Sequence, residues 1–280
     1  MSGHVAKRIG INLAEIKKAY KNIITGIFTA LGTIALFVDL TAYVNTIENA
    51  VIVILVILLS AVFPATVWTL GKREKQIEAY DGPGKLSVEF GDIFYTNTKI
   101  RVIAVNRCFD MMVSKNLVSA KSLHGIWVSK YLASNTREVL DHAIERQLDG
   151  KTFEAVTEKK LGKRRRYPVG TVVEIEEGRH TYYLVAMTTF DSEKLTASCT
   201  AEDYCLGLAR LMKYYNENGQ QEDIALPLIG SGMSRIPKRP MEILQCMLAV
   251  IKMGMNHGQG NIKIVLKKEL KEEISLGEIC

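Results

Sequence analysis

Residues 224–234 read Ile-Ala-Leu-Pro-Leu-Ile-Gly-Ser-Gly-Met-Ser, a short apolar run followed by a serine between two glycines. The apolar run predicts a buried strand, and the two glycines predict a turn directly after it. Backbone N–H groups in such a turn can converge on a phosphate, because glycine places no side chain in the way. The same tripeptide also serves in many proteins as a turn and nothing more. The stretch therefore predicts a strand that ends in a turn, and phosphate binding is one of two interpretations of that turn.

Short β-branched or aromatic runs alternate with amphipathic segments on both sides of this stretch. The runs predict strands at residues 86–90, 100–105, 172–175, 182–187, 224–228 and 262–266. The amphipathic segments predict helices at residues 137–148, 201–218 and 239–255. Strands interleaved with helices of this length indicate an α/β domain with a mixed or mostly parallel sheet covered on both faces.

Two apolar stretches near the start, residues 23–44 and 51–70, are each long enough to cross the roughly 30 Å hydrocarbon core of a bilayer as a helix. They predict a two-helix transmembrane hairpin over residues 23–70. A long buried core helix and its neighbour are the alternative for this pair. Residues 71–84 are charged and then rich in glycine and proline, so they predict a linker to a globular domain at residues 85–280.

Basic residues flank the predicted hairpin at its two ends, and the connector at residues 45–49 has none. They are Lys7, Arg8, Lys17, Lys18, Lys21, Lys72, Arg73 and Lys75. The positive-inside rule then places both termini of this multi-pass protein in the cytoplasm. Residues 1–22 form a basic amphipathic segment, which could lie in the lipid headgroup plane or pack on the soluble domain.

Composition argues against several other classes of protein. A formal net charge of +6 over 280 residues is modest, so no nucleic-acid partner is expected. The five cysteines include no C-x-x-C pair, which fits a reduced compartment without a structural zinc. The sequence lacks the H-E-x-x-H, G-x-S-x-G and P-loop motifs, and no metal site is expected.

Two further groups of residues have a structural and a functional interpretation. Cys199 and Cys205 bracket the start of a predicted helix, and a buried structural role suits them better than a catalytic one. The run Lys163-Arg164-Arg165-Arg166 fits a solvated basic loop, and it also fits a contact with phosphate or lipid headgroups.

Four segments resemble the macrodomain family, whose members are ADP-ribose-binding α/β/α domains. Residues 224–237, IALPLIGSGMSRIP, are similar to the second phosphate-binding loop of the family. Residues 88–93, Val-Glu-Phe-Gly-Asp-Ile, and residues 103–106, Ile-Ala-Val-Asn, look like its opening segments. Residues 122–126, Ser-Leu-His-Gly-Ile, lie where the first diphosphate loop belongs, with one glycine where many members have more. The resemblance covers most of residues 86–266 and implies a three-layer α/β/α macrodomain-like domain behind the hairpin.

The resemblance also implies which residues contact the ligand. The Asp92 carboxylate would accept a hydrogen bond from the adenine amine, beside the backbone of Ile93, and Asn106 ends the second opening segment. The two loops would hold the diphosphate, and their residues are Ser122, Leu123, His124, Gly125, Ile126, Gly230, Ser231, Gly232, Met233 and Ser234. Considered alone, Asp92 also fits a turn-capping aspartate, and His124 also fits a solvent-facing loop residue.

One departure from the family bears on catalysis. Hydrolytic macrodomains usually follow Val-Asn with a second asparagine that orients the distal ribose and a water, and Phe109 occupies that place here. An aromatic ring cannot make those hydrogen bonds. The sequence therefore predicts binding without turnover and no catalytic residues, although Asp110 could take a polar role if the loop shifts.

Two spans followed by a divergent macrodomain look like the membrane effectors of type II Thoeris antiphage defence. That resemblance implies a TIR-domain enzyme that makes an ADP-ribose-type messenger from NAD, such as histidine-linked ADP-ribose. The messenger would bind the macrodomain and drive homo-oligomerisation. The assembled spans would then disrupt the lipid bilayer of the bacterial inner membrane, and the result would be abortive infection. The alternatives are a membrane-anchored ADP-ribosyl hydrolase and a constitutive membrane scaffold.

Overall fold

The computed structural model describes residues 74–77, 84–114, 117–159, 161–191, 196–232, 236, 238–256, 260–276 and 279. The chain divides into two compact units, Glu74–Glu273 and a unit that joins Met1–Arg73 to Ile274–Cys280. The helices and strands named below belong to the first unit. The predicted hairpin at residues 23–70, the segment at residues 1–22 and most of the linker lie outside the described residues. Among the described residues, no helix is both long enough and apolar enough to span a membrane.

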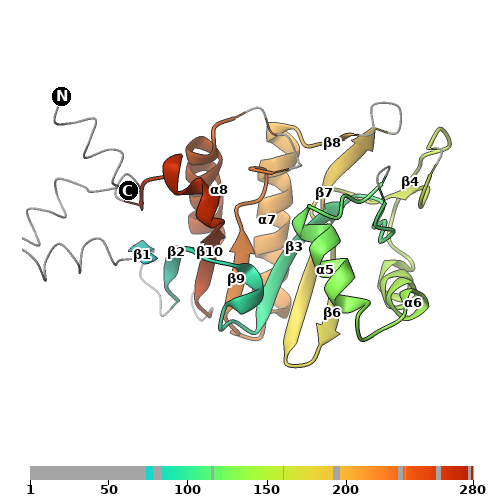
Figure 1. The fold of residues 1–280 in the computed structure, drawn as a ribbon, viewed down its shortest axis with the longest axis horizontal. Helices are drawn as coiled ribbons and strands as arrows, with labels where there is room; N and C mark the ends of the chain where they lie inside the picture. The colour runs from blue at the N-terminus through green and yellow to red at the C-terminus, as the bar shows by residue number, and fades with distance from the viewer. Residues whose placement is uncertain are drawn as a thin grey trace, which may run out of the picture. The chain divides into compact units, whose positions relative to one another are not determined.

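The first unit is built on a mixed sheet with the order β1-β2-β10-β9-β3-β7-β6, in which β8 pairs with β7 (Figure 1). Its strands are β1 (Glu74–Ile77), β2 (Leu86–Phe90), β3 (Ile100–Asn106), β6 (Val172–Glu177), β7 (His180–Asp191), β8 (Thr196–Ser198), β9 (Ile224–Pro227) and β10 (Ile262–Leu266). The five central strands are parallel, and the three pairings of β1, β6 and β8 are antiparallel. The loops that follow the parallel strands therefore meet at one edge, where α/β sheets bind ligands.

Helices cover both faces of this sheet, as Figure 1 shows. They are α5 (Leu123–Tyr131), α6 (Arg137–Leu148), α7 (Ala201–Asn218) and α8 (Pro240–Gly254), with the 3-10 helices η1 (Ile93–Tyr95) and η2 (Lys268–Glu272). Alternate residues of β7 face opposite layers, because side chains alternate along a strand. Tyr182 and Leu184 belong to the core formed with α5 and α6, whereas Tyr183 meets Tyr214 of α7 edge to face. The predicted three-layer α/β/α architecture is confirmed.

Local sequence explains where several helices begin. Thr136 and Thr200 stand before α6 and α7, and each side chain accepts a hydrogen bond from a backbone N–H in the first turn. Both helices have the predicted bounds, and β2 and β10 have theirs. β7 begins two residues before the predicted 182–187 and ends four residues after it. A second, two-stranded sheet pairs β4 (Glu154–Ala155) with β5 (Arg165–Arg166), and the sequence analysis did not predict it.

The prediction of a loop at residues 122–126 is wrong. Ser122 is the N-cap of α5, and the four residues after it form the first turn of that helix. The buried positions of α5 recur at helical spacing, but they include His124 and Gly125, while the apolar Leu123 and Ile126 are only half-buried. The hydrophobicity of the sequence therefore does not follow the burial, and no amphipathic period predicts this helix.

Candidate functional site

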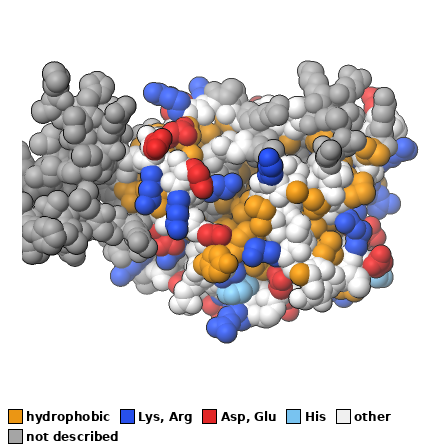
Figure 2. Space-filling view, viewed as in Figure 1, with side chains coloured by type: hydrophobic (Ala, Val, Ile, Leu, Met, Phe, Trp, Pro, Cys, Tyr) orange, Lys and Arg blue, Asp and Glu red, His pale blue; other side chains and the backbone are white. Residues whose placement is uncertain are grey.

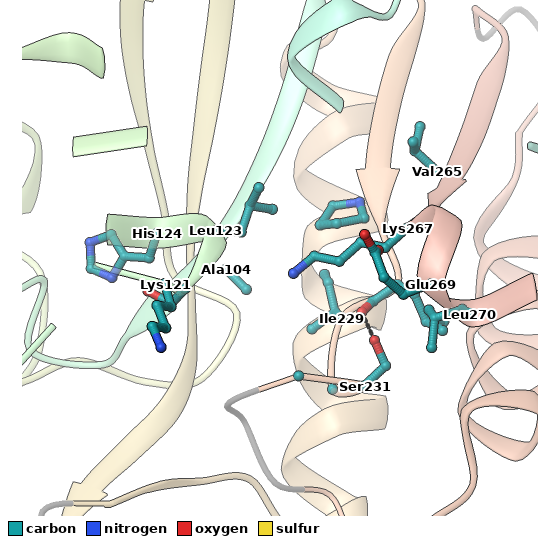
Figure 3. A pocket seen from close by; sticks show the side chains of 15 residues that line it. Ala104, Lys121, Leu123, His124, Ile229, Ser231, Val265, Lys267, Glu269 and Leu270 are labelled. Atoms are coloured by element: carbon teal, nitrogen blue, oxygen red, sulfur yellow. Dashed lines mark hydrogen bonds between the residues drawn. The ribbon is translucent and has the colours of Figure 1, made fainter. Parts of the chain in front are cut away.

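A cavity of about 400 Å³ opens at the carboxyl edge of the sheet, between the segments that follow β3, β9 and β10 (Figure 3). Its walls are Ala104, Lys121, Ser122, Leu123, His124, Pro227, Leu228, Ile229, Gly230, Ser231, Gly232, Val265, Lys267, Glu269 and Leu270. In Figure 3 the residues around the start of α5 face those that follow β9 and β10 across the cavity. The space-filling view in Figure 2 shows apolar side chains near the middle of the visible face, with charged side chains of both signs beside them. The fold thus brings six of the predicted ligand residues to one cavity.

The turn after β9 is built by Gly230 and Ser231. Gly230 has a φ of +95°, and a Cβ at this position would lie 2.5 Å from Cδ1 of Ile236. Only glycine suits that backbone without strain. The Ser231 hydroxyl donates to the Leu228 carbonyl at 2.9 Å and closes the turn. Gly232 differs, because a Cβ there would meet no atom within 4 Å.

The start of α5 forms the facing wall. The Ser122 hydroxyl donates to the Ser119 carbonyl at 2.6 Å and accepts from the Gly125 amide at 3.0 Å. The Ile126 amide donates to the Ser122 carbonyl at 2.9 Å. The amides of Gly125 and Ile126 are therefore used within the protein, and neither residue lines the cavity. The amides of Leu123 and His124 precede the first intrahelical bond, which leaves them available to an anion.

His124 is buried, so its solvent-facing interpretation is wrong. Its Nε2 lies 3.3 Å from Sδ of Met111. Burial lowers the pKa of His124 from 6.5 to about 3, because an imidazolium would lose its hydration there. The imidazole is consequently neutral at ordinary pH and brings no positive charge to the cavity.

Asp92 and Ile93 lie at the end of β2, beside β10. The Asp92 carboxylate caps η1, since its Oδ1 accepts from the Phe94 amide at 3.0 Å. Ile93 is buried against Ala225 and Val265. The structure thus shows the capping role of Asp92, and neither residue is among those that line the cavity. Their contacts with adenine stay a prediction.

The last residue of β3 and two residues of the segment after it lie away from the cavity. Oδ1 of Asn106 accepts from the amides of Cys108 and Asp110, at 3.0 and 3.2 Å. Phe109 is fully buried, and its ring meets Tyr167 edge to face with 5.8 Å between centroids. The Asp110 carboxylate is buried in an ion pair with Lys159 and also accepts from the Lys163 amide. Phe109 is therefore a core residue, and Asp110 is not available to a ligand in this arrangement.

Two remaining predictions concern cysteine and the end of the glycine loop. Cys199 is buried, and burial raises the pKa of its thiol to about 11, as expected for a structural residue. Met233 and Ser234 lie outside the described residues.

A family model described as "Thoeris protein ThsA, Macro domain" matches residues 86–267, which include every wall of the cavity up to Lys267. The chain belongs to this family. Thoeris protein ThsA of Bacillus amyloliquefaciens (strain Y2) is 27% identical over 153 residues, which are 54% of this chain and 50% of that protein. This chain thus spans half the length of the curated relative that it matches.

Solved macrodomains are more distant. The Oceanobacillus iheyensis macrodomain with ADP is 16% identical, with a TM-score of 0.47 over 71% of this chain and 90% of that one. The macrodomain of Thermus aquaticus DarG is 15% identical, with a TM-score of 0.43 over 66% of this chain and 99% of that one. Membership of the ThsA macrodomain family rests on the family model, and the macrodomain resemblance seen in the sequence is confirmed.

Three charged residues line the cavity of this ThsA macrodomain family member and were not predicted from its sequence. Lys121 precedes α5, and Lys267 and Glu269 follow β10. In Figure 3 the Lys267 side chain extends into the space between Leu123 and Ile229. A signal for Lys267 was present, because it directly follows a predicted strand, where parallel sheets present side chains to ligands. The sequence around Lys121 gives no signal that it lines the cavity, because its position depends on how α5 packs against the sheet.

Proposed function

We propose that this chain is a membrane effector of antiphage defence whose macrodomain binds an ADP-ribose-type messenger. The observation that supports it most directly is the pair of phosphate-binding features that face each other across one cavity. The turn at Gly230 offers backbone N–H groups, and the first turn of α5 offers the amides of Leu123 and His124. A diphosphate between them would receive hydrogen bonds from both walls.

The charged walls suit the same ligand. The ammonium groups of Lys121 and Lys267 would offset the two negative charges of a diphosphate. The Glu269 carboxylate can only accept hydrogen bonds when ionised, so it would meet a ribose hydroxyl better than a phosphate. The apolar walls Leu228, Ile229 and Leu270 would cover the remaining surface of the nucleotide.

The end of β3 and the segment after it support binding without turnover. A hydrolase needs a polar group that positions a water beside the distal ribose. The side-chain oxygen of Asn106 accepts from two amides, Phe109 is buried in the core, and the two oxygens of Asp110 are held by Lys159 and the Lys163 amide. On this proposal the chain acts as a sensor, and none of these three side chains serves as a catalytic group.

The remainder of the proposal concerns the messenger and the membrane. A TIR-domain enzyme would make the messenger from NAD, with histidine-linked ADP-ribose as the example, and residues 23–70 would anchor the protein in the bacterial inner membrane with both termini cytoplasmic. Ligand binding can favour an oligomer only if the ligand contacts the oligomer better than the monomer. Clustering of the spans would then convert the signal into membrane disruption.

Calorimetry on the full chain in lipid nanodiscs tests ligand binding, with ADP-ribose, histidine-linked ADP-ribose and AMP as ligands. We expect both ADP-ribose compounds to bind and AMP to bind more weakly, because AMP has one phosphate. Mass spectrometry of the recovered ligand should find it unchanged, and conversion to a product would show a hydrolase. Dye release from liposomes that contain the full chain should require the messenger. Release that does not depend on the messenger would overturn the effector mechanism.

A further inference from the structure

Lys159, Lys163 and Arg166 make ion pairs within the domain. Lys163 pairs with Asp141 at 2.8 Å, and Arg166 pairs with Glu154 at 3.2 Å. Lys159 is 3% exposed, and its Nζ pairs with the Asp110 carboxylate and donates to the Lys163 carbonyl at 2.9 Å. Lys159 and Lys163 therefore join the β4–β5 hairpin, whose described residues are 154–159 and 161–166, to the rest of the domain.

The hairpin closes around Asp110 from several directions. The Lys163 amide donates to Oδ1 of Asp110 at 2.6 Å, while Lys159 meets the other oxygen. Gly162 has a φ of +81°, and a Cβ on it would lie 2.2 Å from Oδ1 of Asp110. The absence of a side chain at Gly162 thus lets the hairpin backbone reach the buried carboxylate.

Tyr167, the residue after the hairpin, contacts the chain segment that contains Asp110. The Tyr167 amide donates to the Arg107 carbonyl at 2.8 Å, and Nε of Arg107 donates to the Tyr167 carbonyl at 2.9 Å. Phe109 lies between the Arg107–Tyr167 hydrogen bonds and the Asp110 ion pair. Its φ is +51°, a conformation that costs free energy for any residue with a Cβ. Such a conformation persists only where surrounding contacts enforce it. The contacts made by Tyr167 and by Asp110 on either side of Phe109 supply that constraint.

The enforced segment leads directly to the cavity. Asp110 is followed by Met111, whose Sδ lies 3.3 Å from Nε2 of His124. His124 belongs to the first turn of α5 and lines the cavity. A displacement of residues 106–111 would therefore reach the α5 wall through the Met111–His124 contact.

We propose that the β4–β5 hairpin clamps the α5 wall of the ligand cavity, and that Lys159 is the positioning residue of this clamp. Lys159 does not touch the ligand; it holds Asp110, and through it the segment that carries Met111 against His124. The inference rests on the proposed binding of an ADP-ribose-type ligand. A buried ammonium and carboxylate depend on each other, because either one alone would be an uncompensated charge.

Lys159→Met tests the clamp in the full chain in nanodiscs, with ADP-ribose as the probe. We expect the Kd for ADP-ribose to rise about 3- to 30-fold, the range seen for residues that couple to a site without touching the ligand. Hydrogen exchange should accelerate in residues 106–124 and stay slow in α7 and α8. Arg165→Ala is the matched control, because Arg165 lies in the same hairpin over the Phe153 ring, 4.8 Å away, and should change neither quantity.

An unchanged Kd would overturn the clamp, and so would exchange that accelerates equally in α7 and α8. If Lys159→Met does not fold, Lys159→Met with Asp110→Leu carries the test, because this pair of changes leaves no unpaired buried charge. A folded double variant with parental Kd and parental exchange also overturns it. If the parent chain does not bind ADP-ribose, the proposed function fails. The exchange in residues 106–124 still decides the clamp in that case.

Discussion

The two walls of the cavity are built in different ways. The turn after β9 depends on its own sequence, because Gly230 supplies the left-handed backbone and Ser231 closes the turn on Leu228. The α5 wall depends on distant contacts, since His124 rests on Met111 and the preceding segment is held by Lys159, which is 49 residues from Asp110. One wall is therefore a local motif that sequence can show, and the other is a product of tertiary packing.

The largest effect should come from Gly230→Val. A β-branched residue at a φ of +95° is strained, and its Cβ would overlap Cδ1 of Ile236. We expect the free energy of unfolding to fall by about 2–4 kcal/mol, measured by denaturant titration of the full chain.

Gly232→Val is the matched control for that variant, because a Cβ at Gly232 would meet open space. Its free energy of unfolding should change by no more than about 0.5 kcal/mol. Its affinity for ADP-ribose should still fall if the backbone there approaches phosphate. Parental affinity in this variant would remove Gly232 from the site, and equal stability losses in the two variants would contradict the local origin of this wall.

The free energy of unfolding should depend on pH through His124, which belongs to the α5 wall. The pKa of His124 is about 3 in the folded protein against 6.5 in the unfolded chain, so the unfolded chain binds the proton first as pH falls. Stability is therefore full above about pH 6.5 and declines from there toward pH 3. The loss at pH 5 should be about 2 kcal/mol. Denaturant titrations at pH 5 and pH 7.5 measure it, and His124→Gln should reduce the difference between them by that amount.

The variants Lys267→Met and Lys121→Met measure how much the positive charge on each side of the cavity contributes to ligand binding. Loss of a charge-assisted hydrogen bond to phosphate should weaken ADP-ribose binding by roughly 1.5 kcal/mol, or about tenfold in Kd. Lys267 extends into the cavity in Figure 3, so its removal should cost more than that of Lys121. Calorimetry at two salt concentrations measures both. Equal Kd values for parent and Lys267→Met would exclude Lys267 from the ligand contacts.

The smallest effect is expected for Ser122→Ala. This change removes the cap of α5, where the hydroxyl serves both the Gly125 amide and the Ser119 carbonyl. Loss of an N-cap should lower the free energy of unfolding by about 1 kcal/mol. The thermal midpoint of Ser122→Ala should fall accordingly, whereas Ser122→Thr keeps the hydroxyl and should fall less. A midpoint unchanged by Ser122→Ala would show that the ligand wall does not depend on this cap.

Much of the fold could be read from the sequence, because its signals are local. The bounds of α6 and α7 follow from capping threonines and amphipathic periods, and β2 and β10 follow from short apolar runs. The glycine turn at 230–232 and the macrodomain-like order of segments are also sequence properties. What these share is that the residues which decide the structure lie within a few positions of one another.

Only the tertiary structure shows how the α5 wall is built and what Phe109, Lys159 and Lys267 do. The sequence of α5 carries no clear amphipathic period, and its helix is explained by the burial of Trp127, Val128 and Tyr131 in the core under the sheet. Phe109 looked like a ligand-facing substitution and is a core residue, and Lys159 is buried although lysine side chains are usually exposed. Lys267 reaches the cavity only because parallel strands bring their ends together. The physical reason is common to all four: each side chain's environment is set by partners far away in sequence, and composition or spacing around the residue carries no record of them.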